Sequence, residues 1–520
     1  MSPASLRGHI AEQFSVTGQA SVQIGDRHYH TGLSAPTSRF RNKHFEVPRN
    51  PSPVFTGREE ICEQLHAYCL LSSKLNIQQQ QKRFVIHGLG GSGKTQVCLK
   101  FAEEHREEFW GIFWVDASST ESLERGYLQV AEACGLESRV SVVQRWLSNI
   151  PEPWVLILDN ADDPRLDISS YFPVGSRGVI LITTRNPDCE VYSTVGSYEL
   201  GAMSTEEAVT LLLKTAGIKD ISDYSARTAA EPVVLILGHL ALAITQAGAV
   251  IRQGYCKMEE YRTLYSQRRK ELLSQEVIQG REDYRYTVYT TWEVSRRMIE
   301  EMPNKAGEDA LALLQMFSLL HYEGISEEFF CRAWHGLHHT GPSDWMISQL
   351  KMLLCQSDQE WNVYSLRKAI SILRAFSLIH RDKTGLISIH PLVHSWTRDQ
   401  MSASDEDMVW RQTTATIALS IPWTFETTDY RFRQSIVPHI DACLDFRENG
   451  IFSLENIGGD CQRMAGNFAL VYSEVGRRQE ALQLTERVVE ANKRTLGEEH
   501  PDTLRSMHAL AICYSEAGRR

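Results

Sequence analysis

The sequence predicts a multidomain α/β protein in which a parallel, doubly wound sheet is followed by α-helical domains. Short apolar runs alternate with helical segments in residues 51–203, a glycine-rich loop joins the first run to a helix, and a segment near the C-terminus is repeated. Such alternation is typical of parallel sheets covered by helices on both faces. A chain of 520 residues is long enough for about three or four domains.

Composition indicates an ordinary folded protein of a reducing compartment. Hydrophobic residues make up 42% and charged residues 23% of the chain. The formal net charge of −11 argues against a nucleic-acid partner, which requires a basic face. The 11 cysteines include no C-x-x-C pair, and no secretory leader is visible, so we expect reduced thiols in the cytosol or nucleus. Of the two, we expect a cytoplasmic location.

Residues 1–50 are expected to form a leader before the first domain. The segment Ser15–Gly25 alternates polar with small or apolar residues, which is typical of a short β-prone element, and the alternative is a disordered leader. Pro51 and Pro53 then stiffen the linker into the next domain.

The sheet domain is expected at residues 51–203. Its candidate strands are Phe84–His87, Gly111–Asp116, Trp154–Asp159 and Gly178–Thr184. Residues 88–95 read GLGGSGKT and match the phosphate-binding pattern G-x-x-x-x-G-K-[ST] at every fixed position. The motif follows the first strand and precedes a helical stretch from Gln96 to His105, which is the context of a P-loop NTPase.

This loop predicts a nucleoside triphosphate ligand with Mg²⁺. Glycines let backbone N–H groups face the phosphates, Lys94 reaches the same phosphates, and the helix that begins there directs its positive dipole end at them. The alternative is a glycine-rich turn, which the strand–loop–helix context disfavours. The expected nucleotide contacts in the loop are Gly88, Gly90, Gly91, Ser92, Gly93, Lys94, Thr95 and Gln96.

Two other strands end in charged residues at the same sheet edge. Asp159 ends one, and with the Thr95 hydroxyl we expect it to hold Mg²⁺, the alternative being a solvated carboxylate. Asn160 follows and cannot accept a proton, so hydrolysis is expected to be slow if the base normally lies at that position. Arg185 ends the other strand and would sense or stabilise the γ-phosphate; a surface ion pair is the alternative.

Residues 204–282 are expected to be helical and 283–402 to form a winged-helix domain. Ser204 and Glu207 make a capping box that opens a helix through Ala216. The apolar stretch 232–251 is long enough for a membrane span, but polar residues interrupt it, so we expect a buried helix. A hairpin is expected where 377–381 and 386–390 flank a turn, with a helix after it.

Residues 403–520 are expected to be helical repeats. The segment Tyr472–Arg478 recurs almost unchanged as Tyr514–Arg520, and small residues around it fit the tetratricopeptide pattern. The second copy ends before its second helix, so the apolar face with Met507 would lack a partner. We therefore expect the array to be truncated here, or another chain to cover this end. We also expect a protein or peptide ligand to bind the repeats.

Taken in order, these motifs resemble the NB-ARC family of STAND-class signalling ATPases. Phe55–Glu59 is similar to the family's entry motif, whose arginine, here Arg58, lies near the nucleotide. Leu237–Ala243 resembles the G-L-P-L motif beside the adenine, where Leu240 is the expected contact. Ser388–Val393 resembles the M-H-D motif, whose histidine, here His390, touches the β-phosphate of ADP. With the repeats, the chain looks most like NLR-type proteins of filamentous fungi, which act in innate immunity.

The resemblance implies a switch that is closed with ADP, exchanges ADP for ATP when a ligand binds the repeats, and then self-associates. The leader is faintly similar to amyloid-forming signalling motifs of such fungal proteins. Ala241 replaces the proline of G-L-P-L, Asn160 replaces a second acidic residue, and Pro391 replaces the aspartate of M-H-D. Slow ATP hydrolysis is the most that these positions imply. The alternatives are a repeat scaffold with a structural nucleotide site and a turnover ATPase.

Overall fold

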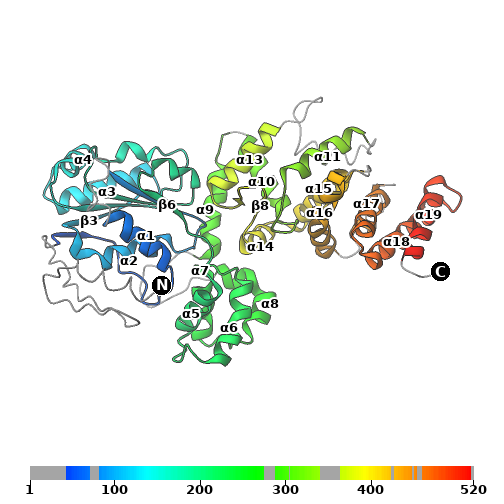
Figure 1. The fold of residues 1–520 in the computed structure, drawn as a ribbon, viewed down its shortest axis with the longest axis horizontal. Coiled ribbons are helices and arrows are strands. Elements are labelled where there is room, and N and C mark those ends of the chain that lie inside the picture. The colour runs from blue at the N-terminus through cyan, green and yellow to red at the C-terminus, as the bar shows by residue number, and fades with distance from the viewer. Residues whose placement is uncertain are drawn as a thin grey trace, which may run out of the picture.

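The structure is a computed structural model. It describes residues 42–70, 81–274, 287–303, 305–339, 363–422, 427–447, 450–453 and 460–516. Most of the expected leader, including the β-prone segment Ser15–Gly25, lies outside these residues. The described elements form a long molecule with the sheet at one end and the C-terminal helices at the other (Figure 1).

Six parallel strands form the sheet in the described part of the chain, in the order β1-β3-β4-β5-β2-β6. They are β1 His44–Glu46, β2 Lys82–His87, β3 Gly111–Asp116, β4 Trp154–Asp159, β5 Val179–Thr184 and β6 Gly196–Glu199. Since β5 lies between β4 and β2, their carboxyl ends bring together the phosphate loop, Asp159 and Arg185 at one edge.

Helices cover both faces of this sheet, which confirms the doubly wound α/β prediction. They are α1 Glu59–Cys69, α2 Lys94–Glu104, α3 Thr120–Ala133 and α4 Val140–Asn149. Alternate residues of β4 enter different cores: Val155 packs with α1 and α2, whereas Leu156 packs with α3 and α4. All six residues of β4 and of β5 are buried, as expected for strands covered on both sides.

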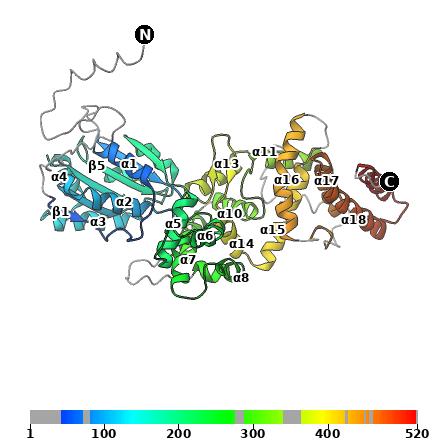
Figure 2. The ribbon, with the colours of Figure 1, turned by 60° about the horizontal axis from the view of Figure 1, so that its bottom comes forward.

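A bundle of four helices follows the sheet (Figures 1 and 2). It consists of α5 Thr205–Ala216, α6 Tyr224–Ile236, α7 Ala241–Arg252 and α8 Tyr261–Ser274. The Ser204 capping box is present. The expectation of one buried helix over 232–251 is wrong, because Gly238 and His239 adopt positive φ values of 57° and 56° and end α6. In the residues that the structure describes, no helix is long and apolar enough to cross a membrane.

The next region contains helices and a small hairpin. Its elements are α9 Val288–Glu300, α10 Lys305–Phe317, α11 Glu327–His339, α13 Val363–Ala375, β7 His380–Arg381, β8 Ile387–Ser388 and α14 Pro391–Asp399. The hairpin is antiparallel and shorter than predicted. The order helix, hairpin, helix is as expected, and the assignment to the winged-helix class stays a prediction. Figure 1 places α9 between the sheet and the rest of this region.

The chain ends in antiparallel helices that continue away from the sheet (Figure 2). They are α15 Ala403–Ser420, α16 Thr427–Phe446, α17 Asp460–Glu474, α18 Arg478–Leu496 and α19 Pro501–Glu516. Leu504 and Met507 on α19 are 55% and 40% exposed. The continuation of the repeats stays a prediction, as do the domain limits. The limits at 203 and 402 fall directly before α5 and α15, and 282 lies outside the described residues.

Candidate functional site

The phosphate loop connects β2 to α2 through a backbone that glycine allows. Gly88, Gly91 and Gly93 have φ values of 141°, 87° and 104°, which side-chain-bearing residues rarely adopt. Gly93 is also the N-cap of α2, and no side chain caps that helix. The first amide N–H groups of α2 are therefore available to an anion.

Two buried polar side chains of the loop fit a phosphate ligand. Lys94 is only 9% exposed, and its Nζ donates to the carbonyls of Gly88 at 2.7 Å and Leu89 at 3.1 Å. Burial lowers the pKa of Lys94 to about 8. The Ser92 hydroxyl is buried without a hydrogen-bond partner. A buried ammonium held by neutral acceptors and an unpaired hydroxyl both suit an anionic oxygen-rich ligand.

Asp159 and Thr95 present oxygen atoms to one point at the end of β4. The Thr95 hydroxyl donates to Asp159 Oδ1 at 3.0 Å, and the Thr183 hydroxyl donates to the same oxygen. Burial raises the pKa of the Asp159 carboxyl to about 6. A carboxylate and a hydroxyl are the ligand types that Mg²⁺ takes, with phosphate oxygens and water completing its shell. The pair therefore fits the metal that the sequence predicts.

The residue after this strand turns the chain back toward the site. Asn160 has a left-handed φ of 65°, and its amide N–H donates a hydrogen bond to Thr183 Oγ1 at 3.0 Å. This turn brings Asp162 against Arg185: Asp162 Oδ1 accepts from the Arg185 backbone at 2.7 Å, and Oδ2 pairs with Arg185 Nε at 3.0 Å. The sequence shows Asp162 shortly after the strand, but not that it reaches Arg185.

The segment before α1 contacts the phosphate loop and the start of α2. Arg58, with a left-handed φ of 68°, donates to the carbonyls of Ser92 at 3.2 Å and Gly201 at 2.8 Å. The Gln96 side chain accepts from the Ser52 amide at 2.7 Å, which ties the linker to α2. Arg58 therefore contacts the phosphate loop and Gln96 directly follows it, and their contact with a nucleotide stays a prediction.

The segment that resembles G-L-P-L also reaches the loop. The Leu242 amide donates to the Gly91 carbonyl at 3.1 Å. A Cβ on Gly91 would lie 3.0 Å from Leu242 Cβ and 3.6 Å from Leu240 Cδ2. The start of α7 is therefore in van der Waals contact with the phosphate loop, and Leu240 borders the site.

His390 joins α14 to the turn before α7. Its Nε2 donates to the Gly238 carbonyl at 2.9 Å, and its Nδ1 accepts from the Leu392 amide at 3.2 Å. Burial lowers the pKa of His390 to about 4, so the ring is neutral at physiological pH. A Cβ on Gly238 would lie 2.5 Å from His390 Cε1, so this position requires glycine. A contact between His390 and a diphosphate stays a prediction.

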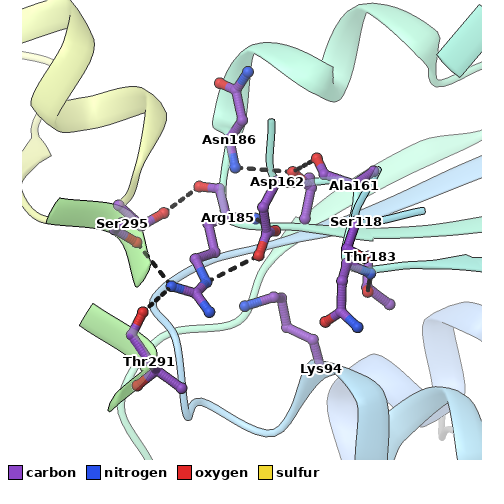
Figure 3. Close-up of polar contacts among 12 residues, drawn as sticks. Lys94, Ser118, Ala161, Asp162, Thr183, Arg185, Asn186, Thr291 and Ser295 are labelled. Carbon is purple, nitrogen blue, oxygen red and sulfur yellow. Dashed lines mark hydrogen bonds and ion pairs between the residues drawn. The ribbon is translucent and has the colours of Figure 1, made fainter. Parts of the chain in front are cut away.

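Arg185 occupies the junction between the loop and α9 (Figure 3). A Cβ on Gly90 would lie 3.2 Å from Arg185 Cζ, so the guanidinium lies directly over the phosphate loop. Its Nη1 donates to the Thr291 carbonyl at 2.5 Å and to Ser295 Oγ at 2.8 Å, both on α9. No local pattern in the sequence points to α9, because its contact with Arg185 joins positions 110 residues apart.

Comparisons with known proteins agree with the resemblance that the motifs carry. A family model for the tetratricopeptide repeat matches residues 460–520. A nucleotide-binding leucine-rich repeat (NLR)-like protein of Hyaloscypha variabilis is 26% identical over 503 residues, covering 89% of this chain and 46% of its own length. The chain therefore spans less than half of that relative.

Similar chains among the solved structures include two Pyrococcus proteins. One is a Walker-type ATPase of Pyrococcus abyssi, with 13% identity and a TM-score of 0.41, covering 68% of this chain and 98% of its own. The other is a STAND protein with a tetratricopeptide repeat sensor from Pyrococcus horikoshii, with 12% identity and a TM-score of 0.27, covering 90% of this chain and 66% of its own.

Proposed function

We propose that the chain is an ATP/ADP-dependent signalling switch of the NLR type. The observation that carries this proposal is the meeting of three distant segments on the phosphate loop. Arg58 contacts the loop from the segment before α1, Leu242 from α7, and Arg185 from the end of β5. A ligand on the loop is surrounded by elements whose mutual contacts it can change, which is what a ligand-controlled equilibrium between two conformations requires.

Within this proposal, different residues of the chain bind the phosphates and the metal ion. The loop amides and Lys94 bind the phosphates, while Thr95 and Asp159 hold Mg²⁺. When bound, Mg²⁺ would neutralise part of the negative charge on the phosphates. We propose that Arg58, Gln96 and Leu240 also contact the nucleotide. With no proton acceptor at Asn160, we propose slow hydrolysis at most.

The closed arrangement in this proposal is the one in which α14 is attached to the α5–α8 bundle. His390 makes that attachment through Gly238, next to the segment that touches the loop. Loss of this contact would free the α10–α14 region and allow self-association of opened chains. We propose that a protein or peptide ligand on the C-terminal repeats starts this change, in the cytoplasm.

The test combines nucleotide content with particle size in the purified full chain. Bound nucleotide is identified by mass spectrometry, and size is measured by light scattering in ADP and in ATP, each with Mg²⁺. We expect retained ADP and a larger particle in ATP, both lost in Lys94→Ala. Lys100→Ala is the matched control, because Lys100 lies on the same helix and pairs with surface glutamates.

Other outcomes identify the competing functions. Sustained turnover at about 1 s⁻¹ or faster, without retained ADP, would indicate a turnover ATPase. Nucleotide content and partner binding that are both unchanged in Lys94→Ala would indicate a repeat scaffold.

A further inference from the structure

Asp162 places a carboxylate beside the two cations of the phosphate site. Its Oδ2 lies 3.0 Å from Arg185 Nε, and its Oδ1 accepts a hydrogen bond from the Arg185 amide at 2.7 Å. Figure 3 shows the Lys94 ammonium directed toward this pair. The side chains of Asp162 and Arg185 are only 18% and 14% exposed, and Lys94 is buried. A fixed negative charge therefore lies in a poorly hydrated part of the site.

The backbone around Asp162 holds its carboxylate at this place. Asn160 has a left-handed φ of 65°, and its carbonyl accepts from the Asp162 amide at 2.7 Å. The Ala161 amide donates to the Thr183 carbonyl at 2.9 Å, and the Thr184 hydroxyl donates to the Ala161 carbonyl at 2.5 Å. The segment that carries Asp162 is therefore anchored to β5, which keeps the carboxylate at the phosphate site.

A third phosphate would bring more negative charge toward this carboxylate. The lysine of a phosphate loop reaches the β- and γ-phosphates of its nucleotide, so the third phosphate would come close to Lys94 and with it to Asp162. Like charges repel strongly here, because the effective dielectric constant is about 20 instead of about 80. A diphosphate lacks the group concerned. A site can select one of two ligands by repelling the other, and Asp162 has the charge and the position to do so.

We propose that Asp162 determines nucleotide specificity: its negative charge beside Lys94 lowers the affinity for a nucleoside triphosphate relative to a diphosphate and so gives the site its preference for ADP. This inference rests on the proposed nucleotide-binding function and names the residue that favours the ADP-bound state. It does not depend on how Arg185 contacts a phosphate, because Asp162 carries its charge with or without that arginine.

Affinity measurements on the full chain test this proposal. Dissociation constants are measured by calorimetry for ADP and a non-hydrolysable ATP analogue, each with Mg²⁺. Pyrophosphate and tripolyphosphate are measured in the same way, to isolate the phosphate chain from the base and the ribose. In the wild type we expect ADP to bind more tightly than the analogue. Asp162→Asn removes the charge and keeps the shape of the side chain, so the ratio of the analogue's dissociation constant to that of ADP should fall by about 10-fold, and the tripolyphosphate-to-pyrophosphate ratio should fall with it.

Two further variants separate the local charge from other effects. Asp163→Asn is the matched control, because it makes the same charge change one residue away, where the carboxylate pairs with Arg165 at 2.9 Å, and it should leave both ratios unchanged. In an Arg185→Gln background the Asp162 carboxylate loses its partner and its charge is no longer offset. Adding Asp162→Asn to that background should therefore lower both ratios by at least as much as in the wild type.

Several results would reject the role of Asp162 and leave the proposed function intact. They are ratios that do not change in Asp162→Asn, a wild type that binds the analogue more tightly than ADP, and an equal fall in Asp163→Asn. Loss of the effect in the Arg185→Gln background would also reject it, because Asp162 would then act only by positioning that arginine. Failure of the wild type to bind either nucleotide would reject the proposed function and this inference with it.

Discussion

Replacing Gly238 with alanine should loosen the contact between α14 and the α5–α8 bundle. The φ of 57° at Gly238 is left-handed and costs an alanine about 1 kcal/mol. The new Cβ would also lie 2.5 Å from His390 Cε1, so the imidazole has to move. That movement breaks the hydrogen bond from His390 to the Gly238 carbonyl, which contributes about 0.5–1.5 kcal/mol. We expect about 1.5–2.5 kcal/mol against the docked arrangement, a factor of about 12–60.

Exchange protection of the amides in α14 measures this free energy directly. The matched control is Gly254→Ala, because Gly254 also has a left-handed φ, of 80°, but has open space where a Cβ would lie. The control carries the backbone cost without the collision, so it should leave α14 protected. Equal loss of protection in the two variants would show that the collision with His390 has no role.

A double-mutant cycle sharpens the test. In a His390→Ala background the imidazole is absent, so Gly238→Ala should cost only the backbone term of about 1 kcal/mol. If the cost is the same with and without the imidazole, the contact does not hold α14 and the reasoning is refuted.

Three further predictions concern buried or partly buried ionisable groups. The pKa of Asp159 is about 6 in the folded chain against an ordinary 3.8, so the folded state binds the proton more tightly and stability falls as pH rises through that window. Asp159→Asn should therefore raise the free energy of unfolding of the nucleotide-free chain at pH 7 by up to about 3 kcal/mol in urea titrations, while abolishing Mg²⁺-dependent nucleotide retention. Burial lowers the pKa of His394 to about 4 from 6.5, so stability should fall as pH falls through that range. The free energy of unfolding is measured by urea titration at several pH values. In His394→Gln its slope against pH in this range should decrease by the equivalent of about one proton, and an unchanged slope would contradict the assignment. Asp399 accepts from Arg269 and from the Tyr289 hydroxyl, so Asp399→Asn should reduce exchange protection of α14 by about 1–2 kcal/mol, and full protection would show that this cluster contributes nothing.

The sequence predicts the strands of the site well because they are buried on both faces. In β4 and β5 every side chain is buried, so each reads as a continuous apolar run that ends at a polar residue. Strands β1 and β6 are only 3 and 4 residues long, and their side chains are partly exposed, so no such run exists. The break between α6 and α7 is missed because hydropathy does not report the left-handed φ values at Gly238 and His239.

Contacts between residues that are far apart in the sequence cannot be predicted from local sequence patterns. His390 and Gly238 are 152 positions apart, and their contact depends on how α14 docks on the bundle. Asp162 reaches Arg185 only because Asn160 adopts a left-handed turn. The phosphate loop, by contrast, is a contiguous motif whose function depends on its own backbone, so its residues are recognisable without any tertiary information.

The ring of His390 serves two structures at once. One nitrogen donates to Gly238, and the other accepts from Leu392 as the N-cap of α14, directly before Pro391. Because the imidazole is rigid, rotation of the ring alone away from Gly238 would also withdraw the cap from Leu392. Both partners of the cap belong to the start of α14, so separation of the whole helix from the bundle breaks only the bond to Gly238. The separated helix therefore keeps a capped first turn, and its return to the bundle does not require that turn to form again.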